Sequence, residues 1–281
     1  AARFVRTINA RLLQKRMNEI KKPAINLYHD NFQNYKVYGI PHAQLVIADI
    51  PYNIGENAYG SNPMWYVGGD NKNGESEHAK SCFFDTDVNF NLVEYMHFCS
   101  KLLVKEPKER GKAPCMIMFC AFNQMQMLIE TGKKYGFNGS IPLFFIKNYS
   151  AQVLKANMRV VGATEFGVIF YRDKLPKFNN NGKMVFDWIE YPRDTKTKKI
   201  HPTQKPVPLL EKLITLFTDP GEVVIDPVAG SGTTLLAAYN TRRNSYGFEC
   251  NNKFYHEAAD LLKSETEDTQ MNLFDFLGDR K

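Results

Sequence analysis

Several features that would define other protein classes are absent from this sequence. Its 281 residues contain five cysteines but no Cys-x-x-Cys pair, so we expect neither a disulfide framework nor a zinc site, and no metal ligands. No apolar run approaches the roughly 20 residues that cross a bilayer. The basic N-terminal stretch also has no continuous apolar segment, so we expect a cytoplasmic protein that is neither secreted nor inserted in a membrane.

The composition fits a globular protein with a basic surface. Hydrophobic residues make up 43% of the chain and the mean hydropathy is −0.39, values typical of a soluble protein with a core. The length suits one large α/β domain with insertions or two small domains. The formal net charge of +6 permits a polyanionic partner such as DNA, although many enzymes of small substrates are equally basic.

A glycine loop between a predicted strand and a predicted helix is the central feature of the chain. The apolar run 223–225 ends in Asp226, the loop contains Gly230 and Gly232, and a helical pattern begins at Thr233. Glycines let the backbone approach a ligand, and a helix N-terminus offers N–H groups to an anion. A nucleoside triphosphate loop would have lysine before the Ser/Thr, and Gly232 stands there. A Gly-x-Gly alone is equally typical of an ordinary strand-to-helix turn.

Other motifs accompany this loop. A buried strand pattern at 45–48 leads into Asp49-Ile50-Pro51-Tyr52, at the end of the strand where open α/β sheets bind ligands. The string His201-Pro202-Thr203-Gln204-Lys205-Pro206 precedes an amphipathic helix. Glu249 ends another short strand, at an interval after Asp226 close to the ~20 residues at which dinucleotide folds place an acid on ribose hydroxyls.

Together, these motifs resemble the amino-group DNA methyltransferases, in the beta class, whose catalytic tetrapeptide precedes the cofactor loop. The resemblance covers most of the chain. It implies a Rossmann-like α/β fold for S-adenosylmethionine-dependent methyl transfer, with a mixed, mostly parallel sheet, helices on both faces, and one domain spanning residues 1–281. The implied reaction moves a methyl group from S-adenosylmethionine to the N6 amine of adenine in DNA, because Asp49 rather than serine heads the tetrapeptide.

The resemblance assigns catalysis to Asp49, Ile50, Pro51 and Tyr52. The lone pair of an exocyclic amine is delocalised into the base, so hydrogen-bond acceptors at its N–H groups stabilise positive charge as the nitrogen attacks. Asp49 and the Ile50 carbonyl would be these acceptors, and Tyr52 would stack on the flipped base. The family has proline where Ile50 stands, so the loop loses the φ restriction of that residue.

The resemblance also implies a cofactor site. Asp30, after a strand at 24–28, would lie near the adenine of the cofactor, and Thr203 and Lys205 would hold its carboxylate. Glu249 would accept hydrogen bonds from the ribose. The expected cofactor residues are Asp30, His201, Thr203, Lys205, Asp226, Pro227, Gly230, Ser231, Gly232, Thr233 and Glu249. Val228 departs from the family, which commonly has phenylalanine there.

Two segments are candidates for contact with DNA. The inserted loop 53–91 is rich in Gly, Asn and Ser with scattered aromatics, which suits a lid or a DNA contact, or a loop packed by its own tryptophan. Segment 172–200 lies where the resembled class reads its target. Its lysines would contact phosphates, while Asn179, Asn180, Asn181 and Arg193 would read base edges; a solvated surface loop is the alternative.

Alternative functions remain open. N4-cytosine methylation uses the same machinery, and an amine in RNA or a glutamine side chain would suit the tetrapeptide. The departures at Ile50 and Val228 also fit a catalytically inactive DNA-binding or regulatory subunit. A cysteine nucleophile, as in carbon-5 methylation of cytosine, is not expected, because Cys115 and Cys120 are not in a Pro-Cys loop. A homodimer and a restriction endonuclease partner are further expectations.

Overall fold

The computed structural model describes residues 22–50, 92–149, 160–200 and 204–278. The basic N-terminal stretch and the loop 53–91 lie outside these ranges. So do four of the expected site residues, Pro51, Tyr52, His201 and Thr203. Every structural statement below concerns the described residues.

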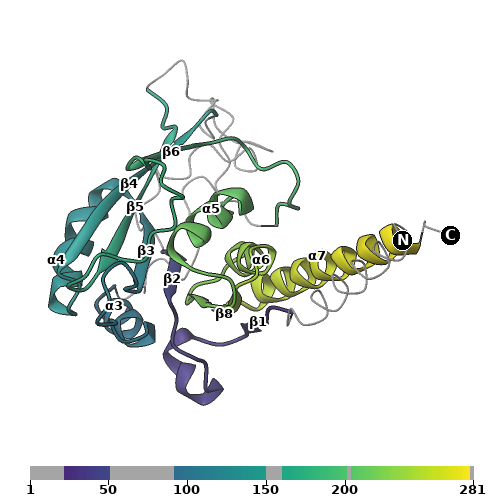
Figure 1. Cartoon of the computed structure of the whole chain (residues 1–281), viewed down its shortest axis with the longest axis horizontal. Helices are drawn as coiled ribbons and strands as arrows, with labels where there is room; N and C mark the ends of the chain where they lie inside the picture. Colours follow the sequence, from purple (N-terminus) through teal and green to yellow (C-terminus); the bar gives the residue numbers. More distant parts are fainter. Residues whose placement is uncertain (1–21, 51–91, 150–159, 201–203, 279–281) are drawn as a thin grey trace, which may run out of the picture.

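An eight-stranded mixed sheet forms the centre of the molecule, in the order β1-β8-β7-β2-β3-β5-β4-β6 (Figure 1). The strands are β1 (Ile25–Tyr28), β2 (Leu45–Asp49), β3 (Cys115–Cys120), β4 (Gly139–Lys147), β5 (Thr164–Tyr171), β6 (Trp188–Tyr191), β7 (Val223–Asp226) and β8 (Asn244–Phe248). Only β5 runs against its neighbours, β3 and β4, and the other adjacent pairs are parallel. The expectation of a mixed, mostly parallel sheet is therefore confirmed.

Helices cover both faces of this sheet, as expected (Figure 1). The helices are η1 (Phe32–Tyr38), α3 (Leu92–Leu102), η4 (Phe122–Gln124), α4 (Met125–Lys134), α5 (Val207–Phe217), α6 (Thr233–Asn240) and α7 (Asn252–Gly278). Successive residues of a strand point to opposite faces, so Leu45 and Ile47 of β2 pack in the core with α5 and α6. Val46 and Ala48 pack in the second core, with α3 and α4.

All parallel strands end at one edge of the sheet, which we call the carboxyl edge. Asp49 and Asp226 end β2 and β7 there, and Glu249 follows β8. Because β5 is antiparallel, its first residues, including Glu165, lie at the same edge, where Glu165 pairs with Phe145 of β4. The carboxyl edge thus gathers acidic residues from strands that are distant in sequence.

Segment 172–200 is divided between the two edges of the sheet. Lys177 N–H donates to the carbonyl of Ala113, before β3, and Asn179 N–H donates to the carbonyl of Leu216, so this half lies at the opposite edge. Phe178 and Phe186 line an apolar cavity of about 910 Å³ between this half and α5. After β6, which is parallel to β4, the second half continues past the carboxyl edge.

Candidate active site

Asp49 is the partly exposed last residue of an otherwise buried strand, at the carboxyl edge. It stands in register with Phe119 of β3, and its Oδ2 is 2.7 Å from Nζ of Lys205. Lys205 lies two residues before α5, is 6% exposed, and places its ammonium group 5.1 Å from the centroid of the Phe119 ring. The string that precedes α5 and the tetrapeptide on β2 are therefore joined through a buried ion pair.

Lys205 also contacts a second carboxylate that was not expected in the site. Its Nζ is 3.3 Å from Oε2 of Glu165, and Oε1 of Glu165 is 2.9 Å from Nζ of Lys147. Burial by itself raises the pKa of Glu165, but the ammonium groups of Lys205 and Lys147 outweigh it and lower that pKa to about 2. Glu165 is therefore ionised across the physiological range.

Glu165 and Lys147 are not among the site residues expected from the sequence, but the structure brings both into the site. The available signal was a charged residue at the end of an otherwise apolar strand, Lys147 after Phe145-Ile146 and Glu165 before Phe166. That signal became informative only with the strand directions, because β5 begins at the edge where β4 ends.

Ile50 is held in place by packing and by a backbone hydrogen bond. Its side chain is 2% exposed and belongs to the core with α3 and α4. Its N–H donates to the carbonyl of Phe119 at 3.4 Å, a bond that proline has no N–H to make. The φ restriction lost with proline is thus replaced by anchoring to β3, which weakens the case that Ile50 marks an inactive subunit.

The glycine loop adopts the tight strand-to-helix turn that its sequence predicts. Gly230 and Gly232 have φ values of 52° and 72°, in the left-handed region, and Gly232 precedes the first residue of α6. Apart from its two chain neighbours, no described residue has an atom within 4 Å of the position that a Cβ would take at Gly230, so the loop is open on that side. The hydroxyls of Ser231 and Thr233 are buried and 3.3 Å apart.

Two carboxyl groups support this loop. Oε2 of Glu249 accepts from the N–H of Gly230 at 2.9 Å, and burial raises the pKa of Glu249. Asp226 is 3% exposed beneath the loop, where its Oδ1 accepts from the N–H of Val228. Burial raises the pKa of Asp226 to about 7, although a hydrogen bond to Thr234 acts in the other direction. Pro227 is buried beside it.

Asp30 lies close to Glu249 through the pairing of β1 with β8. The N–H of Glu249 donates to the carbonyl of Tyr28 at 3.0 Å, two residues before Asp30. The Asp30 carboxylate accepts from the Tyr38 hydroxyl at 2.7 Å and from Asn34, and these hydrogen bonds lower its pKa. The sheet order β1-β8-β7-β2 thus sets Asp30, Glu249, the glycine loop and Asp49 side by side.

The buried thiols of Cys115 and Cys120 are not suited to nucleophilic attack. Burial raises the pKa of Cys115, and it raises the pKa of Cys120 to about 12, so neither thiol is a thiolate nucleophile at neutral pH. Across the described ranges, no three His, Cys, Asp or Glu residues gather as a metal site. No helix in those ranges combines the length and apolar character needed to span a membrane.

Comparison with known proteins identifies the family. A family model described as DNA methylase matches residues 43–260, more than half of the chain. The chain belongs to this DNA methylase family. The matched region includes Asp49, the glycine loop and Glu249, so the family assignment rests on the segments that form the candidate site.

Individual relatives and solved structures match most of this chain. The DNA adenine methyltransferase YhdJ of Escherichia coli (strain K12) is 26% identical over 229 residues, 75% of this chain and 72% of that protein. The type II methyltransferase M.HpaI of Haemophilus parainfluenzae is 24% identical over 254 residues, which are 84% of this chain and 71% of that protein. The crystal structure of an M1.HpyAVI–SAM complex has a TM-score of 0.61 at 23% identity, over 84% of this chain and 98% of that one. The cytosine-N4-specific PvuII DNA methyltransferase has a TM-score of 0.59 at 16% identity, over 88% and 93%.

Proposed function

We propose that this methylase transfers a methyl group from S-adenosylmethionine to the N6 amine of adenine in DNA. The observation that carries the proposal is the Asp49 carboxylate at the carboxyl edge, two strands from Glu249 and beside the open glycine loop. The relative YhdJ is named an adenine methyltransferase. The cytosine-N4 name of one structural neighbour keeps that amine as the alternative acceptor.

The described residues fit S-adenosylmethionine. The open side of the loop at Gly230 admits a ligand against the backbone, and the carboxylates of Glu249 and Asp30 would accept hydrogen bonds from ribose hydroxyls and adenine. Glu249 already accepts from the Gly230 N–H, so the carboxylate is oriented beside the loop before a ligand binds. The other expected residues of the loop, Asp226, Pro227, Ser231, Gly232 and Thr233, would support its shape from below.

Catalysis would depend on stabilising charge at the target nitrogen. When bound, S-adenosylmethionine supplies an electrophilic methyl group. Asp49 would accept a hydrogen bond from one N–H of the target amine, and the Ile50 carbonyl would accept from the other, so positive charge on the nitrogen is stabilised. Tyr52 would stack on the extruded base. No covalent enzyme intermediate is needed, in agreement with the buried, protonated thiols of Cys115 and Cys120.

Within 172–200, we assign DNA contact to the half beyond β6. Arg193 is exposed, and its guanidinium lies 4.7 Å from the centroid of the Tyr149 ring. We assign it to a phosphate contact, in place of the base-edge reading expected from the sequence. The exposed lysines that follow it are Lys196, Lys198 and Lys199. In the first half, Lys177 is ion-paired and the Asn179 amide donates to Thr218 and Asp219, so these groups serve the scaffold.

The assignment of Arg193 is testable with a matched control from the same segment. Arg193→Ala should weaken duplex DNA binding about 3–10-fold and reduce its salt dependence, since one phosphate contact is removed. Lys183→Ala removes an exposed charge from the turn before β6 and should change the affinity less than twofold. Equal effects of the two variants would show that the contact depends only on net charge. We also propose that the chain forms a homodimer and that loop 53–91 acts as a lid. The type II names of relatives suggest a restriction endonuclease partner.

The reaction itself is tested with methyl-labelled S-adenosylmethionine and unmethylated genomic DNA, followed by separation of nucleosides. Label in N6-methyladenine that disappears in Asp49→Ala is the expected result. Label in N4-methylcytosine would support the same mechanism with cytosine, in place of adenine, as the target base. Cofactor binding without label in DNA would favour an amine in RNA or protein, or a regulatory subunit.

A further inference from the structure

Four charged side chains form a continuous line across the carboxyl edge. Lys147 at the end of β4 contacts Glu165 on β5, Glu165 contacts Lys205 before α5, and Lys205 contacts Asp49 on β2. The hydroxyl of Tyr191, on β6, adds a hydrogen bond to Glu165. The line therefore connects strands β4, β5 and β6 to the residue that would contact the target amine.

Because its four side chains are largely buried, this line of charges is not expected to add much to the stability of the fold. The exposed fractions of the side chains are 7% for Lys205, 13% for Lys147, 21% for Glu165 and 27% for Asp49. Removing charges from water costs free energy that their mutual attraction often fails to recover, and apolar residues of similar volume often serve stability as well. The position of the line beside Asp49, rather than its contribution to folding stability, therefore indicates a role in methyl transfer.

The geometry has two consequences for Asp49. A carboxylate at the end of a strand can rotate about its side-chain torsions, and an ammonium group 2.7 Å from Oδ2 restricts that rotation. The same ammonium group would also neutralise the negative charge that stabilises the attacking nitrogen. Glu165 opposes this second effect, because it shares the charge of Lys205 at 3.3 Å while remaining ionised itself.

We propose that Glu165 is a positioning residue for methyl transfer, acting through Lys205 to orient Asp49 and to preserve its negative charge. Lys205 is thereby assigned to Asp49 rather than to the carboxylate of the cofactor, which was its expected partner. Lys147 balances the negative charge of Glu165, with which it forms an ion pair. The inference rests on the proposed function, because it presumes that Asp49 contacts the target amine.

The test separates binding from the chemical step. Lys205→Met, Glu165→Gln and the double variant are compared with the wild type by single-turnover methyl transfer at saturating cofactor and DNA. Calorimetry measures the affinity for S-adenosylhomocysteine, and thermal unfolding gives the folded fraction. We expect transfer to slow about 100-fold in Lys205→Met and about 10-fold in Glu165→Gln, with affinities within threefold of the wild type. Lys112→Met, which breaks a surface pair with Glu109, should change neither quantity.

Coupling between the two substitutions distinguishes positioning from independent effects. If Glu165 acts through Lys205, the double variant should be no more than threefold slower than Lys205→Met. Multiplied effects would overturn the inference, as would a tenfold loss of S-adenosylhomocysteine affinity in Lys205→Met at an unchanged rate, since that assigns Lys205 to the cofactor. A wild-type chain that methylates no DNA would overturn the proposed function and this inference with it.

Discussion

Lys205 and Lys177 make the same kind of contact at opposite edges of the sheet. Each is a buried lysine between two carboxylates, with Lys205 joining Asp49 and Glu165, and Lys177 lying 2.7 Å from Asp219 and 2.5 Å from Glu222. The partners of Lys177 are close in sequence and belong to the turn before β7, whereas those of Lys205 stand on two different strands. The comparison teaches that chemistry alone does not identify a functional ion pair.

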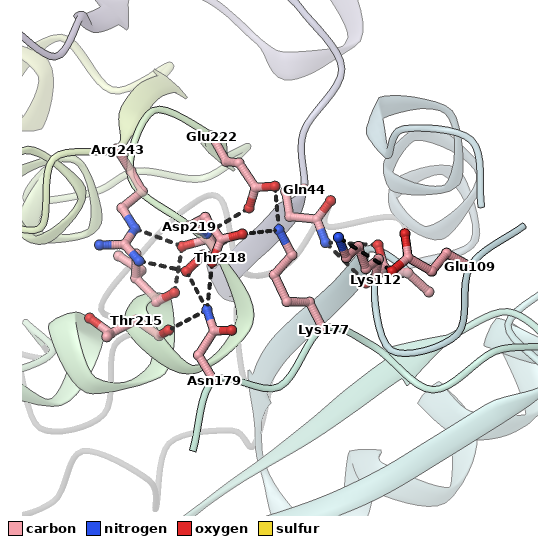
Figure 2. A network of polar contacts seen from close by, with 12 residues as sticks. Gln44, Glu109, Lys112, Lys177, Asn179, Thr215, Thr218, Asp219, Glu222 and Arg243 are labelled. Carbon is pink, nitrogen blue, oxygen red and sulfur yellow. Dashed lines mark hydrogen bonds and ion pairs between the residues drawn. The ribbon is translucent and has the colours of Figure 1, made fainter. Parts of the chain in front are cut away.

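The surroundings of Lys177 explain its structural character. Figure 2 shows its carboxylate partners within a dense polar cluster that includes Asn179, Thr218 and Arg243. The N–H of Asp219 donates to Glu222 at 2.7 Å, and the Arg243 Nε donates to the Thr218 hydroxyl at 2.9 Å. The groups of this cluster close the loops that connect α5, β7 and β8, so removing one loosens the scaffold. At the carboxyl edge, the carboxylate of Asp49 instead faces the region where ligands bind open α/β sheets.

The largest contrast is expected between Asp49→Asn and Asp219→Asn. Both replace a lysine-paired carboxylate with an amide of the same size. Asp49→Asn should reduce the rate of methyl transfer about 10³-fold, because the charge that stabilises the target nitrogen is lost. Asp219→Asn should leave the rate per folded molecule within twofold of the wild type. Single-turnover assays of both variants check this, and comparable losses would erase the functional distinction between the edges.

A smaller contrast is expected between Glu249 and Glu222. Glu249→Ala should weaken binding of S-adenosylmethionine about 10- to 100-fold, because a charge-assisted hydrogen bond to the ribose is lost and the support of Gly230 N–H is removed. Glu222→Ala, at the opposite edge, should leave the affinity unchanged. Isothermal calorimetry gives both values. An unaffected Glu249→Ala would locate the ribose partner elsewhere.

How far the sequence could predict these two edges depends on which interactions are local. Asp49 and the glycine loop were predictable because a buried strand followed by a polar turn is a local pattern, and parallel strands share one carboxyl edge. Glu165 and Lys147 were not, because their role requires that β5 run antiparallel between β3 and β4. Local patterning does not specify strand direction.

The basic segment 172–200 also shows that local sequence does not reveal contacts between distant residues. Its lysines look alike in sequence, but Lys174 donates to the carbonyls of Pro107 and Lys108, and Lys177 is ion-paired. These partners are 42 or more residues away in the chain. Composition suggested phosphate contacts for the whole segment, and only the fold separates the lysines of the scaffold from the exposed ones beyond β6.

A third contrast concerns stability. Lys177→Met should lower the free energy of unfolding by about 1–2 kcal/mol, because the carboxylates of Asp219 and Glu222 lose a buried partner but can still reach water. Lys112→Met, in a pair whose side chains are 56% and 67% exposed, should lower it by less than about 0.5 kcal/mol. Urea unfolding measures both. Equal stabilities would mean that the Lys177 cluster is as dispensable as a surface pair.

The smallest effect is expected from Asp226, whose described partners are the N–H of Val228 and Thr234 rather than a lysine. Its pKa is raised from 3.8 to about 7 in the folded chain, so between these values the folded state binds more protons than the unfolded state. Stability contributed by this group is therefore complete below about pH 4 and lost as the pH rises through 7. From pH 6 to 8 the loss should be about 1 kcal/mol.

Asp226→Asn has no such titration, so urea unfolding of the wild type relative to this variant should show the difference. Parallel curves would mean that Asp226 is ionised beneath the loop over this pH range, as Glu165 is beside Lys205.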